Sequence, residues 1–244
     1  MRLKLTVQYD GTDYCGWQLQ PGLRTIQGVL TDAISIVEEA PVRLFGAGRT
    51  DAGVHALGQV CHVDVTKQHD DLTWARAINA HLDRDRDVQV MRVEHVGPEF
   101  HARRSAKGKT YTYRVWTGPF VSPFERRYVA HAPRPHDVDL MRAAAAALVG
   151  THDFEAFTVS DRETKTTIRQ LRRLDLSEDG DVLVMTAEAG GFLRAMVRTI
   201  AGTLLAIGDG RLAADAVEVA LRERRREFAG PTATAAGLTL VRVD

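Results

Sequence analysis

The chain has 244 residues, of which 44% are hydrophobic and 26% are charged, and its 32 basic and 32 acidic side chains give a formal net charge of zero. These values are typical of a soluble globular protein with a sizeable core, in one large domain or two small ones. They exclude a disordered or collagen-like chain. No apolar run is long enough to span a bilayer, no leader-like segment opens the chain, and the only two cysteines favour reduced thiols. We therefore expect a cytoplasmic protein.

In the first part of the chain, apolar residues recur at every second position in some segments and about every 3.6 positions in others. In chain order we expect a strand at 3–7, a helix at 26–39 capped by Thr25, strands at 42–45 and 59–65, a helix at 71–82 and a strand at 87–96. This order of strand, helix, strand, strand, helix, strand fits the α+β class, with helices on one face of a mainly antiparallel sheet, as in ferredoxin-like and RNA-recognition folds.

The second part repeats a comparable order of elements with a different sequence. We expect a strand at 109–117, a helix at 138–149 capped by Asp137, a hairpin of strands at 168–176 and 182–188, helices at 192–207 and 213–224, and a last strand at 237–243. The chain therefore divides into two similar α/β halves, residues 1–105 and 106–244. No linker rich in Pro, Gly or Ser marks this boundary.

A glycine-rich loop separates two strands of the first half, over residues 45–56. Its single carboxylate, Asp51, follows Arg49 by two residues. An adjacent guanidinium stabilises an ionised carboxylate, which suits a nucleophile or a base rather than a general acid. A tight turn with a local ion pair is the alternative interpretation. His55 follows four residues after Asp51, but a single Asp-His pair is weak evidence for a metal site.

Basic side chains gather in one segment despite the zero net charge. Residues 101–114 contain no acid, and only five of the 32 basic residues of the chain are lysine. Arginine suits phosphate contact and base stacking, because its planar guanidinium binds oxyanions through two donors. The segment therefore predicts RNA contacts, by Arg103, Arg104, Lys107 and Lys109.

The loop sequence Gly-Arg-Thr-Asp-Ala-Gly-Val-His-Ala resembles, without a gap, the signature of the TruA family of tRNA pseudouridine synthases. Four further segments are similar to family segments and occur in family order: residues 14–18, 100–103, 196–198 and 237–240. The resemblance covers nearly the whole chain. It implies two α/β halves that join in one strongly curved sheet, a catalytic cleft between the halves, and a homodimer.

The resemblance also implies roles for single residues. It makes Asp51 the catalytic residue, and Arg49 the arginine that helps to hold the target nucleotide out of its stack. Tyr111 matches a tyrosine whose ring stacks on uracil, and Arg198 an arginine that pairs with the catalytic carboxylate. Leu238 matches a residue that packs near the base.

Each of these assignments has a plainer alternative. Arg49 could serve only as an ion-pair partner of the loop carboxylate. Tyr113 shares a strand face with the favoured tyrosine and competes with it for the role. Arg198 could lie on the outer face of its helix together with Arg194, and Leu238 could be an ordinary core residue.

The activity implied by the resemblance is isomerisation of uridine to pseudouridine in the anticodon stem-loop of tRNA, at uridines 38, 39 and 40. The reaction breaks the bond from ribose C1′ to N1 and rejoins the base through C5, so it requires no cofactor and no metal. Two alternatives stay open: a non-catalytic RNA-binding module, and a metal-dependent hydrolase that would use Asp51, His55 and His62. The polar loop at 160–167 matches the family little, so its role is not predicted.

Overall fold

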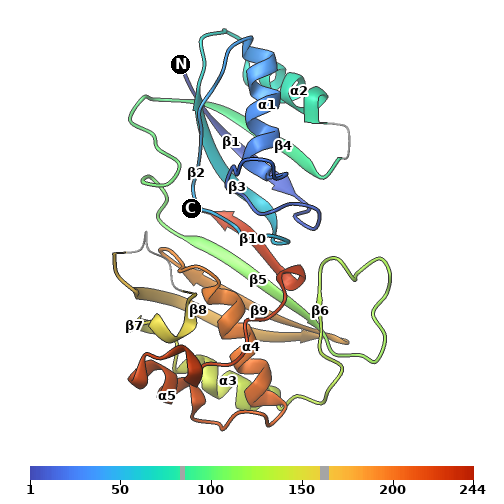
Figure 1. Ribbon diagram of the computed structural model, residues 1–244, viewed down its shortest axis with the longest axis vertical. Coiled ribbons are helices and arrows are strands. Elements are labelled where there is room, and N and C mark those ends of the chain that lie inside the picture. The colour runs from blue at the N-terminus through green and yellow to red at the C-terminus, as the bar shows by residue number, and fades with distance from the viewer. Residues whose placement is uncertain (83–85, 160–164) are drawn as a thin grey trace. The chain divides into compact units, whose positions relative to one another are not determined.

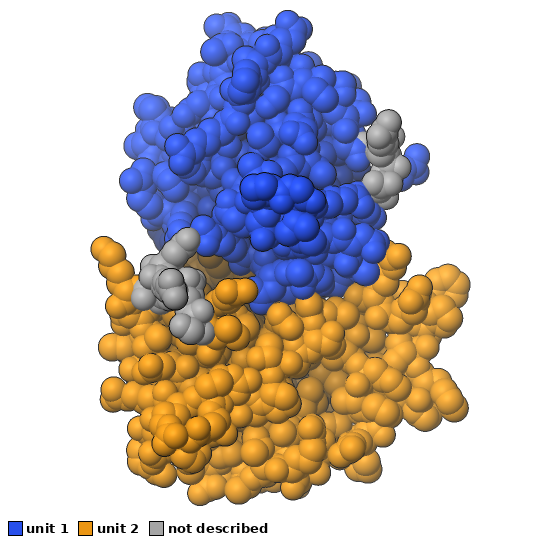
Figure 2. Space-filling view, viewed as in Figure 1, with its two compact units in different colours: residues 1–107, 239–244 blue, residues 108–238 orange. Residues whose placement is uncertain are grey.

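The chain divides into two compact units. Unit 1 comprises Met1–Lys107 and Thr239–Asp244, and unit 2 comprises Gly108–Leu238 (Figure 2). The computed structural model describes residues 1–82, 86–159 and 165–244. The observed division at residues 107 and 108 lies close to the boundary expected near residue 105. The last six residues, which we expected in the second half, belong to unit 1 instead.

Unit 1 is a sheet covered by two helices. Its elements are β1 (Arg2–Tyr9), α1 (Ile26–Glu38), β2 (Leu44–Gly46), β3 (His55–Asp64), α2 (Asp71–Leu82), β4 (Val88–Val96) and β10 (Leu238–Val243) (Figure 1). β1 lies between β4 and β3 and is antiparallel to both. β2 pairs with β3 in antiparallel fashion, whereas β10 runs parallel to β3 through Thr239 and Leu240.

The two faces of this sheet differ in character. The helices α1 and α2 lie against one face of the sheet (Figure 1). Leu3 pairs with Val63, and both are fully buried, which assigns them to that face. α1 forms because its apolar residues recur at helical spacing and because the Thr25 hydroxyl accepts a hydrogen bond from the amide of Gly28. Lys4, one residue beyond Leu3, points to the opposite face, which carries the contacts of Arg2, His62 and Asp64 discussed below.

Unit 2 has the same two-layer design. Its elements are β5 (Lys109–Trp116), β6 (Ala130–His131), α3 (Val138–Ala146), β7 (Gly150–Asp153), β8 (Ile168–Asp179), β9 (Val182–Ala189), α4 (Met196–Gly208), α5 (Ala216–Glu223) and short 3-10 helices at 155–157, 226–228 and 235–237. The strand order β5-β9-β8-β7 is antiparallel throughout. β6 adds a short parallel pair to β5.

The structure confirms the α+β class and the mainly antiparallel sheet, and it corrects several element bounds. The helix expected at 192–207 begins at Met196, because Ala195 adopts a left-handed conformation with φ of 57°. The strand expected at 59–65 begins at His55. Leu193 precedes Met196 and is buried but not helical, so the spacing of apolar residues alone cannot show where the helix begins.

The expectation of a helix at 138–149 was too long, since α3 ends at Ala146. Of the polar loop at 160–167, residues 160–164 lie outside the described part of the chain. Within the described part, no helix combines the length and the apolar character needed to cross a membrane.

Candidate active site

Asp51 lies in the loop between β2 and β3 of unit 1. The loop is turned back on itself, since the amide of Val54 donates to the Asp51 carbonyl oxygen at 3.2 Å and Gly53 adopts a φ of 78°. At the start of the loop, the amide of Ala47 donates to the carbonyl oxygen of Val60 at 2.7 Å. Asp51 is half-buried and Arg49 is exposed. The carboxylate therefore sits on a backbone that the sheet positions at both ends.

A buried hydroxyl network supports the loop from the sheet side. The Tyr9 hydroxyl lies 2.9 Å from the Thr50 hydroxyl, one residue before Asp51. The amide group of Gln59 donates to the Gly48 carbonyl oxygen at 3.1 Å and to the Tyr9 hydroxyl at 3.4 Å. Burial raises the pKa of Tyr9 to about 12, so its phenol stays neutral and serves as a hydrogen-bonding group.

The segment after β1 holds the loop from its other side. The amide of Trp17 donates to the Thr50 carbonyl oxygen at 3.0 Å, and the amide of Gly53 donates to the Tyr14 carbonyl oxygen at 3.3 Å. Gly16 makes this approach possible, because it has a φ of 84° and a Cβ there would lie 2.7 Å from the Thr50 oxygen. Only glycine tolerates both conditions at once.

Two side chains near the loop have partners that define their roles. Arg49 donates from Nε to the side-chain oxygen of Gln18 at 3.0 Å. His55 is buried at the start of β3, where its Nδ1 accepts from the Gly11 amide at 3.1 Å and lies 3.1 Å from the Asp10 carboxylate. His55 therefore joins the turn after β1 to the strand that follows the loop.

The residues needed for a metal centre do not gather here. Among residues 1–82, 86–159 and 165–244, no group of three or more His, Cys, Asp and Glu side chains is arranged to hold a metal ion. His62 lies on β3 and accepts from the Ala102 amide through Nδ1. The hydrolase alternative built on Asp51, His55 and His62 has no support from the described residues.

In unit 2, Tyr111 and Tyr113 lie on the same buried face of β5, as strand alternation predicts. The Tyr111 ring meets Phe192 edge-on, with centroids 5.2 Å apart. Tyr113 is fully buried, and its hydroxyl donates to the Thr234 carbonyl oxygen at 2.9 Å. Burial raises the pKa of Tyr113 above its ordinary value. Tyr113 therefore has a structural function, and the assignment of the active-site role to Tyr111 stays a prediction.

Arg198 is half-buried in the first turn of α4. Its Nε donates to the Ala233 carbonyl oxygen at 2.8 Å, and its own carbonyl oxygen accepts from the Ala233 amide at 3.0 Å. Arg194 is exposed and precedes the helix, so the two arginines do not share a solvated helix face. Leu238 is buried at the start of β10, as either interpretation of that residue requires.

The predicted RNA-binding residues follow β4. Arg103 and Arg104 are exposed in a short turn, and Lys107 is exposed with its amide donating to the Asp244 carbonyl oxygen. Lys109 is half-buried at the start of β5.

The site residues divide between the two units. Asp51 and Arg49 belong to unit 1, whereas Tyr111, Arg198 and Leu238 belong to unit 2. The expectation that these two sets meet in one cleft, with Arg198 against the Asp51 carboxylate, stays a prediction.

Sequence reasoning missed the residues that support the Asp51 loop. Tyr9 looks like the last apolar residue of a strand, and Gln59 looks like an ordinary strand residue. Two signals were present: Gly11 lies in a turn cluster, and Gly16 lies within residues 14–18, one of the segments that resemble the family. A Cβ on Gly11 would lie 2.0 Å from the Val54 carbonyl oxygen, so that glycine also permits close packing on the loop.

Comparison with known proteins gives the same family over both units. A family model described as tRNA pseudouridine synthase matches residues 5–103 and 144–244. The chain is 42% identical to tRNA pseudouridine synthase A of Bacillus licheniformis, over 100% of this chain and 98% of that protein. It is 43% identical to the protein of the same name in Methylobacterium nodulans, over 100% and 95% of the two chains.

A further relative and one solved structure complete the comparison. The chain is 41% identical to tRNA pseudouridine synthase A of Limosilactobacillus fermentum, over 99% of this chain and 95% of that one. A chain in "Crystal Structure of a Cbf5-Nop10-Gar1 Complex" aligns with 93% of this chain and 69% of its own length, at 13% identity and a TM-score of 0.32, too low to carry an argument. The full-length sequence matches and the family model together show that this chain belongs to the tRNA pseudouridine synthase family, a family of isomerases.

Proposed function

We propose that this protein converts uridines 38, 39 and 40 of the tRNA anticodon stem-loop to pseudouridine, with Asp51 as its catalytic residue. The observation that carries the proposal is the way the Asp51 loop is built. Neighbouring Thr50 is held through its hydroxyl by Tyr9 and through its carbonyl oxygen by Trp17, while the half-buried Asp51 side chain is presented by the loop between β2 and β3.

The reaction requires few chemical groups. The bond between ribose C1′ and N1 breaks, the uracil turns, a bond forms between C1′ and C5, and the hydrogen on C5 leaves to solvent as N1 gains a proton. Asp51 acts in this sequence as the nucleophile or the base. The detached uracil must rejoin the same ribose, so the carboxylate must keep its position beside the ribose while the base turns. A rigidly held loop favours this. No cofactor enters this scheme.

The remaining site residues bind the nucleotide and the RNA. Arg49 holds the extruded nucleotide out of its stack, and Tyr111 stacks on the uracil. Arg198 pairs with the Asp51 carboxylate, and Leu238 packs near the base. Phosphate contacts come from Arg103, Arg104, Lys107 and Lys109. We further propose that the protein works as a homodimer in the cytoplasm.

The experiment is a tritium-release assay on an unmodified tRNA transcript labelled at uracil C5. Pseudouridine formation transfers tritium to water, and the Asp51→Asn variant should abolish release while it binds tRNA as the wild type does. Asp32→Asn, which makes the same change on an exposed face of α1, is the matched control and should release tritium normally. Transcripts in which cytidine replaces uridine 38, 39 or 40 in turn assign the positions.

Three outcomes would contradict the proposal. Undiminished release by Asp51→Asn would remove Asp51 from the chemistry. Tight binding of several tRNAs by the wild type, without any release, would favour the non-catalytic RNA-binding alternative. Release that persists when all three anticodon-arm uridines are replaced would assign the reaction to other positions.

A further inference from the structure

The face of the unit 1 sheet that the helices leave uncovered carries a line of charged and aromatic residues. Lys4 pairs with His62 across β1 and β3, and Phe45 pairs with His62 across β2 and β3. Directly paired residues of antiparallel strands lie on the same face, so all three side chains share the face opposite α1 and α2. Phe45 lies on the short strand β2 and is half-buried.

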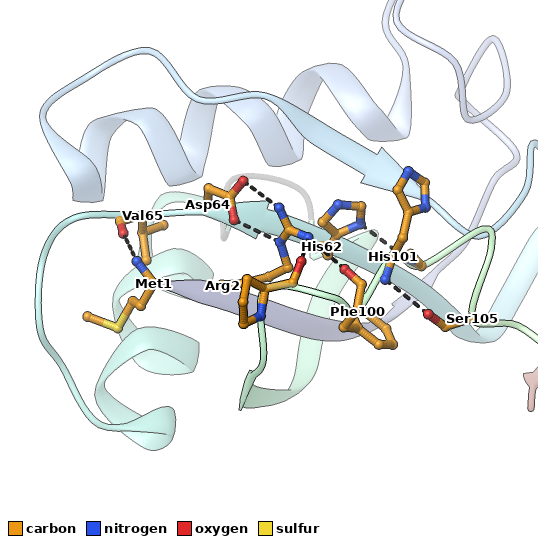
Figure 3. A network of polar contacts seen from close by, with 10 residues as sticks. Met1, Arg2, His62, Asp64, Val65, Phe100, His101 and Ser105 are labelled. Atoms are coloured by element: carbon orange, nitrogen blue, oxygen red, sulfur yellow. Dashed lines mark hydrogen bonds and ion pairs between the residues drawn. The ribbon is translucent and has the colours of Figure 1, made fainter.

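The segment after β4 lies over this face and is fixed to it by Arg2 (Figure 3). The Arg2 guanidinium binds both carboxylate oxygens of Asp64 at 2.8 Å and donates to the carbonyl oxygen of Phe100 at 2.8 Å. The Ala102 amide donates to Nδ1 of His62 at 3.2 Å. These contacts hold both the segment and the His62 ring in place.

The same segment closes a tight turn that directs its basic residues outward. The amide of His101 donates to the Ser105 hydroxyl at 3.0 Å, and the Ser105 amide donates to the His101 carbonyl oxygen at 2.8 Å. The Arg103 amide donates to Nδ1 of His101 at 3.2 Å. Arg103 and Arg104 are exposed on this turn.

Three aromatic rings and a guanidinium meet where the turn reaches the strand β2. Phe45 stacks on His62 with ring centroids 5.0 Å apart and planes inclined by 14°. The His101 ring lies 4.7 Å from the His62 ring and 5.7 Å from the Phe45 ring. The exposed Arg43 guanidinium lies 4.7 Å from the centroid of Phe45. The half-buried rings of Phe45 and His101 form the floor of a basic surface.

The two imidazoles of this surface add no charge near neutral pH. Burial, followed by the neighbouring His101, lowers the pKa of His62 to about 4. Burial and then the Arg104 guanidinium lower the pKa of His101 as well. The carboxylate of Asp64 is paired with Arg2, which lowers its pKa and balances its charge. Both imidazoles are therefore neutral aromatic rings surrounded by guanidinium groups.

We propose that Arg43, Phe45, His101, Arg103 and Arg104 form an RNA-binding surface, on which the arginines contact backbone phosphates and an unpaired base stacks on the two rings. Surfaces that combine neutral aromatic rings with positive charges bind single-stranded RNA, because each base can stack on a ring and each nucleotide carries a phosphate. The inference rests on the proposed function for the identity of the RNA, a tRNA, and it adds Arg43, Phe45 and His101 to the residues that contact it.

The test measures tRNA affinity at several salt concentrations, independently of catalysis. Arg43→Gln should weaken binding and lower the slope of log affinity against log salt by about one unit, because one phosphate contact is lost. Phe45→Leu, which keeps an apolar side chain under the surface, should weaken binding on the order of tenfold and leave the slope unchanged. Arg76 is exposed on α2, on the helix-covered side of the same sheet. Arg76→Gln makes an equal charge change and should bind as the wild type does.

The outcomes separate this inference from the proposed function. If Arg43→Gln and Phe45→Leu bind tRNA as tightly as Arg76→Gln does, and thermal unfolding shows all three folded, the surface does not bind RNA. If the wild type releases no tritium but the two variants still lose affinity, the proposed function fails and the surface stands. A change of oligomeric state with tRNA affinity unchanged would make the surface an interface between two copies of the chain, and would overturn the inference.

Discussion

Replacing Tyr9 by Phe tests whether the candidate catalytic loop depends on its support from the sheet. Tyr9 is 4% exposed and Thr50 is 7% exposed, and their hydroxyls lie 2.9 Å apart. The substitution removes one buried hydrogen bond and leaves the Thr50 hydroxyl and the longer contact from Gln59 without this partner. A loss of this kind lowers the free energy of unfolding by about 1–2 kcal/mol. For a chain of this length that corresponds to a fall in Tm of roughly 2–8 °C.

The effect on activity should exceed what the loss of stability explains. Thr50 directly precedes Asp51, so its release lets the carboxylate move relative to the bound nucleotide. Misplacement of a catalytic group by a fraction of an ångström to an ångström lowers the rate of the chemical step by about tenfold or more. Single-turnover tritium release at saturating tRNA, measured well below the Tm of the variant, isolates this step.

Asn79→Ala is the matched control. The Asn79 side chain makes two hydrogen bonds, at 2.9 and 2.8 Å, with the backbone of Val90, and so connects α2 to β4 within the same unit. Its loss should lower the Tm by an amount similar to that for Tyr9→Phe, without an effect on the single-turnover rate. Equal rates for the two variants at equal loss of Tm would refute the reasoning, because the loop would then not depend on Tyr9.

Three further predictions concern other residues of unit 1. Gly16→Ala should lower both the Tm and the rate of tritium release, since the added Cβ would lie 2.7 Å from the Thr50 carbonyl oxygen at a φ of 84°; wild-type values in both assays would contradict the packing described. The pKa of His62 falls from 6.5 to about 4 on folding, so the unfolded chain binds a proton that the folded protein excludes. Stability should therefore decrease as the pH falls from the upper to the lower of these pKa values, by about 1–2 kcal/mol once solvent screening is taken into account. Denaturant unfolding across that range should show a weaker pH dependence for His62→Gln, and an unchanged dependence would assign the effect to another group. An alkylating reagent should modify the exposed Cys15 but not Cys61 in the native protein, because burial raises the pKa of the Cys61 thiol. Mass spectrometry of native and denatured samples measures this, and a rapid second modification in the native sample would contradict it.

Local signals in the sequence predicted two helix N-termini and the hairpin turn. Thr25 caps α1 through the Gly28 amide, and Asp137 caps α3 through the Leu140 amide, as the sequence led us to expect. Gly180, with a φ of 56°, turns the hairpin between β8 and β9. Each of these features depends on residues within four positions of one another, which is the range over which capping and turn preferences act.

Features that depend on distant residues escaped prediction. The break before α4 arises at Ala195, a residue with no intrinsic preference for its left-handed conformation. The contact between Tyr9 and Thr50 spans 41 residues of sequence. Tertiary packing determines both, and neither periodicity nor composition reports on it. The short strands β6 and β7 were missed for a related reason, because strands of two and four residues give too little pattern to recognise.

The candidate site shows the same division between local and distant information. The motif around Asp51 is contiguous, so the sequence sufficed to single out this carboxylate. The partners of the surrounding loop come from β1, from the segment after it and from β3, and they are not contiguous with this motif in the sequence. Of the predicted residues, Arg198 was expected to bind a carboxylate, and the structure adds a hydrogen bond from its Nε to the Ala233 carbonyl oxygen.

The last strand explains how the chain supports the downstream end of the Asp51 loop. β10 runs parallel to β3 beside His55 and Ala56, the first residues after the loop. Gly58 allows this approach, since a Cβ there would lie 2.6 Å from the Val241 carbonyl oxygen. Parallel strands require a long connection, and here the connection from β3 to β10 includes α2, β4 and all of unit 2. Closing so long a connection costs conformational entropy, which the packing of β10 against β3 must offset. A short motif therefore singles out Asp51 as a candidate, whereas the position of its loop depends on residues from both ends of the chain.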